Sequence, residues 1–179
     1  MKKIQELTGR SLRWEQPRAM ECLYELRDGD KVVATLACSG SFKPTSSFAS
    51  ADGRWEFRQA NFWGMRTLIF AEGSCTEIAT FHHNMWTGGG RLEIRGVPVL
   101  QAKSNFTMTR LEIQNLSGHP IVRCDRFRGM FHKSADLRLA PDAEDLSERP
   151  WLAGLIWHLV LKLQRETSGA AGAAAAAGA

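Results

Sequence analysis

The basic side chains of the segment RCDRFRGMFHKSADLR, residues 123–138, are the strongest candidates for binding chemistry. Five cations stand here against two carboxylates, so the segment has a formal charge of +3. A surface of this charge would attract anionic lipid headgroups or another acidic partner. The alternative is a solvated pair of strands whose outward charges discourage aggregation through exposed edges. The candidate residues for anionic-ligand binding are Arg123, Arg126, Arg128, Lys133 and Arg138.

Other site chemistries find less support in the residue spacing. His82 and His83, with His119 or His132, could be imagined around a metal ion, but neighbouring residues of a strand point to opposite faces. The glycines of residues 87–91 lack the spacing and the lysine of a phosphate-binding loop. Neither a nucleophile elbow nor a zinc-protease helix motif occurs. We therefore predict no metal and no cofactor, and an enzyme of unidentified chemistry stays only as an alternative.

Aromatic and basic residues are interleaved between Arg54 and Arg66, as in platforms that stack single-stranded nucleic acid. Their alternation has a simpler explanation, in which Trp55 and Phe57 pack inward while Arg54 and Arg58 face the solvent. The net charge of +4 and the pI of about 9.1 support nucleic acid only weakly. We expect no nucleic-acid partner.

Size and composition are those of one ordinary globular domain. The chain has 179 residues, 44% hydrophobic and 23% charged, which suffices to bury a core without disulfides or metals. The N-terminal residues lack the apolar run of a secretion signal. The four cysteines are scattered without a Cys-x-x-Cys pair, which favours reduced, buried thiols. We predict a cytoplasmic protein, with peripheral attachment to a membrane as an open alternative.

Short apolar segments separated by turn signals dominate the chain from Met20 to about Leu139, which is typical of an all-β sandwich or barrel. The Asp-Gly pair within residues 27–30 predicts a hairpin turn. In residues 105–115 the alternation changes phase, so we expect a bulge or a strand boundary near Thr109 and Arg110. About ten strands are predicted, and they lie in residues 20–26, 31–38, 55–59, 67–72, 75–82, 91–95, 97–102, 105–115, 121–128 and 133–139.

Three segments of different character divide the chain. Residues 1–19 read as a polar lead-in, and residues 20–166 as a single barrel domain with a helix over 150–165. Residues 167–179 are rich in alanine and glycine, and we predict that this tail is disordered.

The segment RPWLAGLIWHLVLKLQRE, residues 149–166, is the longest apolar run and allows three interpretations. As a helix, residues 151–163 span about 20 Å, whereas a bilayer core requires about 20 apolar residues. A transmembrane anchor is therefore disfavoured. A helix on one side of a sheet would bury only part of its apolar surface, because the polar stripe formed by His158, Lys162 and Arg165 is narrow.

Near-complete burial is the third interpretation, and it is the one that the energetics favour. Nine large apolar side chains surround most of the helix, and burying them contributes roughly 14–27 kcal/mol in gross terms. Strands that close around the helix would supply this burial and would also remove exposed sheet edges. Pro150 suits the first turn of such a helix, and Asp142, Glu144, Asp145 and Glu148 complement its positive end. We predict a mainly β fold, a closed antiparallel barrel around a buried hydrophobic C-terminal helix.

This layout resembles the tubby C-terminal-like superfamily, which includes the plant LURP-one-related proteins and the phospholipid scramblases. The resemblance rests on the helix RPWLAGLIWHLVLKL and on the segments YELRDGDKVVATL and GHPIVRCDRFRG, and it spans roughly residues 14–165. It implies about twelve strands threaded by the helix. It also implies phosphoinositide binding, lipid scrambling or a role not settled, because fold alone does not select among these. The family's phosphoinositide-binding residues do not align to positions of this chain.

Two further hypotheses accompany these expectations. The leading function is a non-enzymatic tubby-like barrel that binds an anionic lipid surface or a protein partner. A carrier of small apolar ligands, of the lipocalin kind, is the alternative, and the place of the helix discriminates between them. For the helix we expect His158 to contact a polar group of the barrel wall, and Lys162 and Arg165 to emerge at an open end. The oligomeric state does not follow from the sequence.

Overall fold

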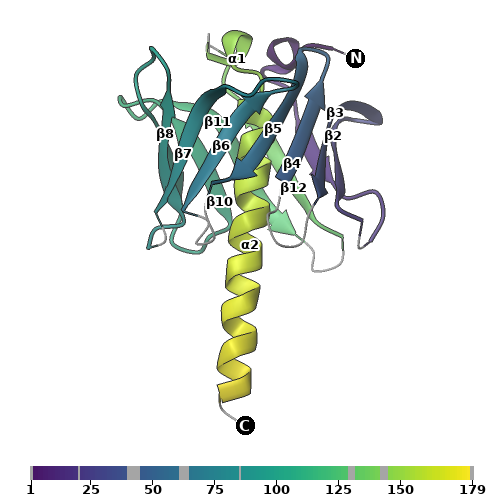
Figure 1. Ribbon diagram of the computed structural model, residues 1–179. Helices are drawn as coiled ribbons and strands as arrows, with labels where there is room; N and C mark the ends of the chain where they lie inside the picture. The colour runs from purple at the N-terminus through teal and green to yellow at the C-terminus, as the bar shows by residue number, and fades with distance from the viewer. Residues whose placement is uncertain are drawn as a thin grey trace.

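The structure is a computed structural model that describes residues 2–19, 21–39, 45–60, 65–84, 86–128, 132–141 and 145–177, with side chains to Glu166. Twelve strands of the described residues form one antiparallel sheet (Figure 1). A 3₁₀ helix, η1 (Ile4–Leu7), precedes them, and two α-helices, α1 (Asp145–Glu148) and α2 (Leu152–Ala177), follow. The strands are β1 (Leu12–Glu15), β2 (Leu23–Asp28), β3 (Lys31–Ser39), β4 (Thr45–Ser50), β5 (Gly53–Gln59), β6 (Arg66–Ala71), β7 (Glu77–Asn84), β8 (Gly89–Ile94), β9 (Leu100–Ser104), β10 (Arg110–Gln114), β11 (Pro120–Arg128) and β12 (Ser134–Leu139).

The sheet closes on itself. Each strand pairs with its predecessor and its successor along the chain, and β1 pairs with β12, with Leu12 opposite Leu137. Closure leaves none of the twelve described strands with an unpaired edge. The prediction of a mainly β, closed antiparallel barrel of about twelve strands is confirmed.

The barrel has two ends of different connectivity. Because all neighbours are antiparallel, successive connections alternate between the two ends. Five hairpin connections lie at the end that also holds η1 and α1, which we call the upper end: β2–β3, β4–β5, β6–β7, β8–β9 and β10–β11. The six connections β1–β2, β3–β4, β5–β6, β7–β8, β9–β10 and β11–β12 lie at the opposite, lower end. α2 begins near the upper end and leaves the strands at the lower end (Figure 1).

Two strands escaped the sequence prediction. β1 lies within residues 1–19, where Leu12 and Trp14 are buried, and η1 adds Ile4 and Leu7 to the core. The prediction that residues 1–19 are a polar lead-in is therefore wrong. The four buried apolar residues stand among charged ones, and their alternation with polar residues is too short to be recognised as a strand. β4 is rich in serine, and only Phe48 marks its inward face.

The phase change predicted in residues 105–115 is a strand boundary. β9 ends at Ser104 and β10 begins at Arg110, so the residues between them form a turn rather than one long strand. Met108 adopts a φ of 52°, in the left-handed region that only glycine enters without cost. The altered parity of the apolar residues therefore reflects this turn.

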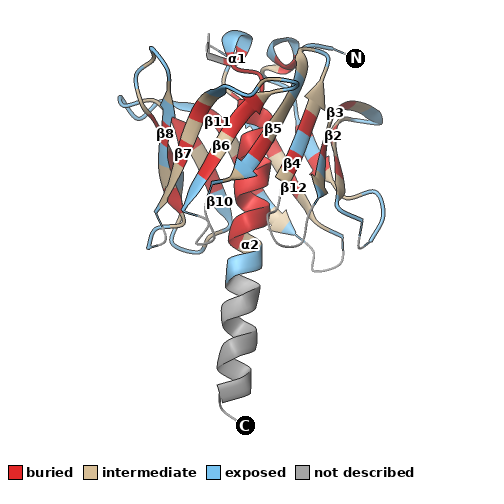
Figure 2. Cartoon of the chain, viewed as in Figure 1, coloured by how far each residue is buried: buried red, intermediate tan, exposed pale blue. Residues whose placement is uncertain are grey.

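α2 buries its first three turns. Trp157 is fully buried and stacks on Trp14 of β1 at 5.8 Å between ring centroids, and its edge meets Tyr24 of β2 at 5.6 Å. His158 lies 5.5 Å from the ring of Phe57 in β5. Further contacts join α2 to β3, β10 and β11. The buried part of α2 lies among the strands, and exposure begins where the helix leaves them (Figure 2).

α2 is longer than the helix predicted over 150–165. It begins at Leu152 and runs to Ala177, into the segment for which we predicted disorder. Alanine has the highest helix propensity, so the alanine-rich sequence continues the helix. Of the acidic residues expected before the helix, Asp142 and Glu144 lie outside the described residues.

Gly154 allows the closest approach between α2 and the wall. A methyl group at this position would lie 2.3 Å from Cγ of Phe48. We expect Gly154→Ala to lower the free energy of unfolding by up to about 2 kcal/mol, because overpacking costs about 1–3 kcal/mol and the gain in helix propensity is about 1 kcal/mol. Urea unfolding measures the change.

A double-mutant cycle tests the cause of that loss. In a Phe48→Ala background the Cγ and Cδ2 atoms that the new methyl group would meet are gone, so Gly154→Ala should cost less there than in the wild-type background. An equal cost in both backgrounds would show that Gly154 serves something other than packing on Phe48.

Candidate functional site

The five cations predicted as one anionic-ligand site lie in three separate regions: the outer wall, a groove on the side wall, and the lower end. Arg123 and Arg138 are register partners on β11 and β12, but Arg123 is ion-paired. Its Nε lies 2.8 Å from Asp125 and 3.2 Å from Glu112. Asp125 also accepts a hydrogen bond from Arg110 Nε at 2.7 Å. Arg123 therefore belongs to a charge network on the outer wall, which is the solvated-strand alternative for this residue.

A bulge displaces the next cation. The register of β11 and β12 shifts between Asp125 and Arg128, and Arg126 has a φ of 55° within this shift. Arg126 Nη1 lies 3.1 Å from Asp136. Together with Arg10 and Arg138 it lines an open groove of about 410 Å³ on the side wall. The bulge thus separates Arg126 from Arg128, although only two positions divide them in sequence.

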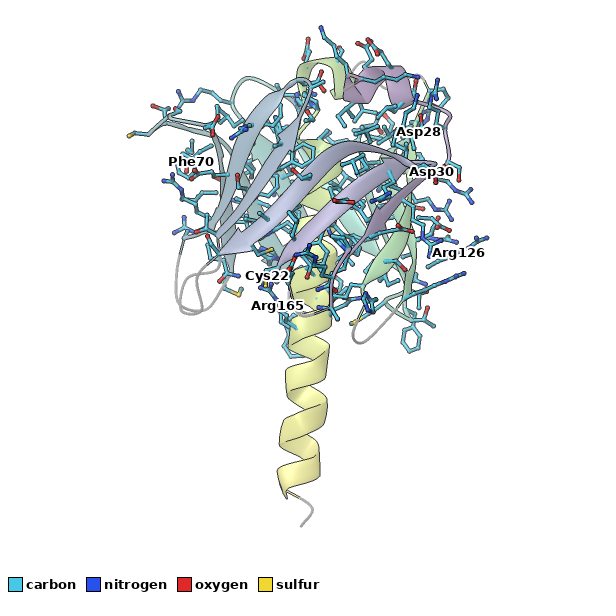
Figure 3. The ribbon with its side chains drawn as sticks, turned by 90° about the vertical axis from the view of Figure 1, so that its right-hand side faces the viewer. Cys22, Asp28, Asp30, Phe70, Arg126 and Arg165 are labelled. Atoms are coloured by element: carbon cyan, nitrogen blue, oxygen red, sulfur yellow. The ribbon has the colours of Figure 1, made fainter. Side chains whose placement is uncertain are left out.

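Arg128 and Lys133 lie at the lower end, where α2 emerges. Burial lowers the pKa of Lys133, and the nearby charge of Arg165 lowers it further. The charge of Arg165 is therefore felt at Lys133, at the end where α2 leaves the strands. Figure 3 shows Arg165 beside the emerging helix, far from Arg126 on the side wall.

Carboxylates at the lower end are already ion-paired. Glu21 pairs with Arg18 at 3.2 Å, and Glu166 pairs with Lys162. Glu15 contacts two arginines of the neighbouring wall. Among the residues that the structure describes, no carboxylate forms an ion pair with any of four further cations at this end. These lower-end cations are Arg66, Arg128, Lys133 and Arg165.

Exposed apolar side chains gather at the same end. Of the four large apolar residues that are exposed in the described chain, only Leu116 lies in an upper connection. Trp86 is 94% exposed in the β7–β8 connection, and Phe106 is fully exposed in the β9–β10 connection. Met65, next to β6, is the third. Three of the four therefore lie at the lower end, on three separate connections.

Sequence reasoning missed Trp86, Phe106 and Arg165 as site residues. A signal for them exists in the sequence once strand bounds are known. Each of the three lower connections β5–β6, β7–β8 and β9–β10 contains a described methionine, phenylalanine or tryptophan, whereas none of the five upper hairpin connections does. The signal depends on topology, which joins segments far apart along the chain.

The histidines do not converge. His82 faces outward and lies 3.4 Å from Glu93, whereas His83 Nε2 lies 2.8 Å from the buried hydroxyl of Thr67. Neighbouring strand residues thus point apart. No group of three or more histidine, cysteine or acidic side chains suited to a metal ion occurs among the described residues.

Ser46 and His158 form the pair that most resembles a nucleophile and its base. Ser46 Oγ lies 2.8 Å from His158 Nδ1 and 3.3 Å from Cys38 Sγ. Ser46 is 2% exposed and His158 5%, so a substrate cannot reach the hydroxyl. Burial, with Arg165 and Lys162, lowers the pKa of His158 to about 3, which makes it a poor base at neutral pH. The pair joins β4 to α2 structurally.

The polar stripe of α2 follows the sequence prediction in part. The hydrogen bond of His158 to Ser46 confirms the expected contact with the wall. Arg165 is exposed, as predicted, but Lys162 is only 8% exposed and pairs with Glu166 one turn later. A long side chain can bury its stem while its ammonium reaches a partner nearer the solvent.

The cysteines correct one further expectation. Cys124 is buried, and burial raises the pKa of its thiol, but Cys22 and Cys75 are exposed. All four thiols, including the half-buried Cys38, are free.

No family model, curated protein or solved structure matches this chain. The described helices include none that is both long and apolar enough to cross a membrane.

Proposed function

We propose that this protein is a non-enzymatic barrel of the tubby-like kind, with α2 as the core of the barrel, and that its lower end binds anionic lipid headgroups. The lower-end cations carry the proposal of lipid binding, because none of them forms an ion pair with a carboxylate of the described residues. Like charges gathered at one end of the barrel favour an anion there.

The contacts of α2 support its role as the core. Trp14, Tyr24, Phe48 and Phe57 come from four strands on one part of the closed sheet, and β10 and β11 contact α2 from another part. A helix in this position occupies the space in which a lipocalin-like carrier would hold its ligand. The same contacts therefore argue against the carrier hypothesis.

The separation of the cations selects the lower end over the side wall. On the side wall Arg123 and Arg126 already have carboxylate partners. A phosphate approaching them competes with an existing ion pair. At the lower end an approaching phosphate meets the cations without that competition. The proposal thus keeps Arg128 and Lys133 from the predicted five residues and adds Arg165.

Exchanging Arg128, Lys133 and Arg165 together for alanine should weaken binding to anionic vesicles. Each cation near an anionic membrane contributes about 1 kcal/mol, so the triple variant should bind roughly 100-fold more weakly at about 0.1 M salt. Sedimentation with vesicles of phosphatidylcholine and about 30 mol% phosphatidylserine measures the change.

A matched triple variant controls for net charge. Arg10, Arg126 and Arg138 line the side-wall groove, and their exchange for alanine removes the same formal charge. This control should bind within about threefold of wild type, since charges beyond a Debye length of about 10 Å are screened at 0.1 M salt. Equal losses in the two variants, or a wild-type protein that leaves the vesicles unbound, would refute the proposal.

A further inference from the structure

We infer that the lower end docks on the bilayer by inserting Trp86 and Phe106 between the lipid headgroups. The inference rests on the proposed function and adds an apolar contact to the electrostatic one. Tryptophan and phenylalanine partition into the interfacial region of a bilayer, where the ring is desolvated and the indole N–H stays hydrated.

Both aromatic tips are presented by ordered turns. The side chain of Asn84 accepts a hydrogen bond from the backbone N–H of Trp86 at 3.0 Å. Asn105 accepts hydrogen bonds at 2.8 Å from the backbone N–H groups of Thr109 and Arg110, which closes the turn that carries Phe106. These hydrogen bonds hold backbone groups of the two turns, so binding would require little further ordering of these backbones.

The surroundings of the two tips fit a lipid surface. The lower-end cations lie at the same end as the rings, so anionic headgroups and the apolar interface can be engaged at once. Trp86 also borders an open groove of about 550 Å³, whose lining includes Met65, Arg91 and Gln101. Because Arg91 lies 3.7 Å from Glu93, the groove adds apolar atoms beside Trp86 rather than a further unpaired cation.

A bilayer suits this end better than a second protein surface does. The rings stand on separate connections, from β7–β8 and β9–β10, at the end that also holds the lower-end cations, which have no carboxylate partner among the described residues. A flat anionic surface satisfies all of these groups together. α2 leaves the barrel at this end and continues to Ala177, so docking brings the alanine-rich helix to the headgroups as well (Figure 1).

The test compares Trp86→Ser/Phe106→Ser with Leu116→Ser in the full chain. Leu116 is 64% exposed at the upper end, so its exchange removes a similar apolar group on the opposite side. With vesicles of phosphatidylcholine and about 30 mol% phosphatidylserine, the double variant should bind at least about tenfold more weakly, and the control within about twofold of wild type. The deficit of the double variant should persist at high salt, where the electrostatic contribution is screened.

Quenching by brominated lipid reports insertion directly. The Trp86→Phe variant lacks the exposed indole, so the difference between its quenching and that of the wild type isolates Trp86. We expect this difference to appear only with vesicles. Wild-type binding with no Trp86 quenching, or with an unaffected double variant, would overturn the inference and leave the proposed function standing. Loss of a wild-type dimer in the double variant without vesicles would assign the surface to a second copy instead, and would also overturn it.

Discussion

Replacing Trp157 with alanine is expected to lower the free energy of unfolding by about 3–5 kcal/mol, the usual cost of emptying a fully buried tryptophan site. Trp157 stacks on Trp14 with an interplanar angle of 4° and meets the ring of Tyr24 edge-on. The cavity would open between α2 and two strands that cannot close over it without distorting the barrel. Thermal unfolding should shift down by roughly 6–20 °C for a chain of this size.

Two variants sharpen the interpretation of that loss. Trp86→Ala removes an equally large ring that is 94% exposed, and it should change stability by no more than about 0.5 kcal/mol. Trp157→Phe retains an aromatic ring and removes the buried Nε1, which has no hydrogen-bond partner among the described residues, so it should cost less than alanine. A loss below about 1 kcal/mol for Trp157→Ala would place α2 outside the core.

Local sequence patterns predicted most strands of the barrel, because a strand that buries one face alternates apolar and polar residues. Tyr24 and Leu26 in β2, or Leu111 and Ile113 in β10, point inward while their neighbours are less buried. The same rule failed where the inward residues are few or small. In β4 the inward Ser46 contacts His158 rather than an apolar partner, so no alternation of hydrophobicity marks the strand.

The candidate site was less predictable because it depends on contacts between distant segments. Arg123 to Arg138 are neighbours in sequence, but strand alternation and the bulge at Arg126 distribute them over the wall and the lower end. Conversely, Phe106 and Arg165 come to one end only through the order of the strands and the direction of α2. The sequence shows where basic residues are concentrated. The topology was required to show which of these cations have no carboxylate partner among the described residues.

Acidification should destabilise the protein through two histidines that are held neutral in the folded state. Burial, with the nearby charges of Arg165 and Lys162, lowers the pKa of His158 to about 3. Burial, with Lys162 and His158, lowers the pKa of His83 to about 3 as well. In the unfolded chain each imidazole takes up a proton below about pH 6.5. Between pH 6.5 and 3 the unfolded state therefore binds more protons, and stability falls as the pH falls.

The expected magnitude is large for a marginally stable domain. Each histidine contributes up to about 1.4 kcal/mol per pH unit in this window, so the pair contributes up to roughly 5 kcal/mol between pH 6.5 and 4.5. Native domains have only about 5–15 kcal/mol of stability, so unfolding near pH 4 is expected. Urea unfolding at a series of pH values gives the slope, to which carboxylates common to all variants also contribute.

His158→Gln isolates the contribution of the buried imidazole, because glutamine can still hydrogen-bond Ser46 but does not titrate. The variant should lose stability at neutral pH through imperfect packing, yet its stability should fall less steeply on acidification, by up to about 1.4 kcal/mol per pH unit. His119→Gln, at an exposed position, is the matched control for the exchange itself. If the free energy of unfolding has the same dependence on pH in His158→Gln and in the wild type between pH 6.5 and 4.5, the imidazole of His158 is not held neutral where α2 packs on β4.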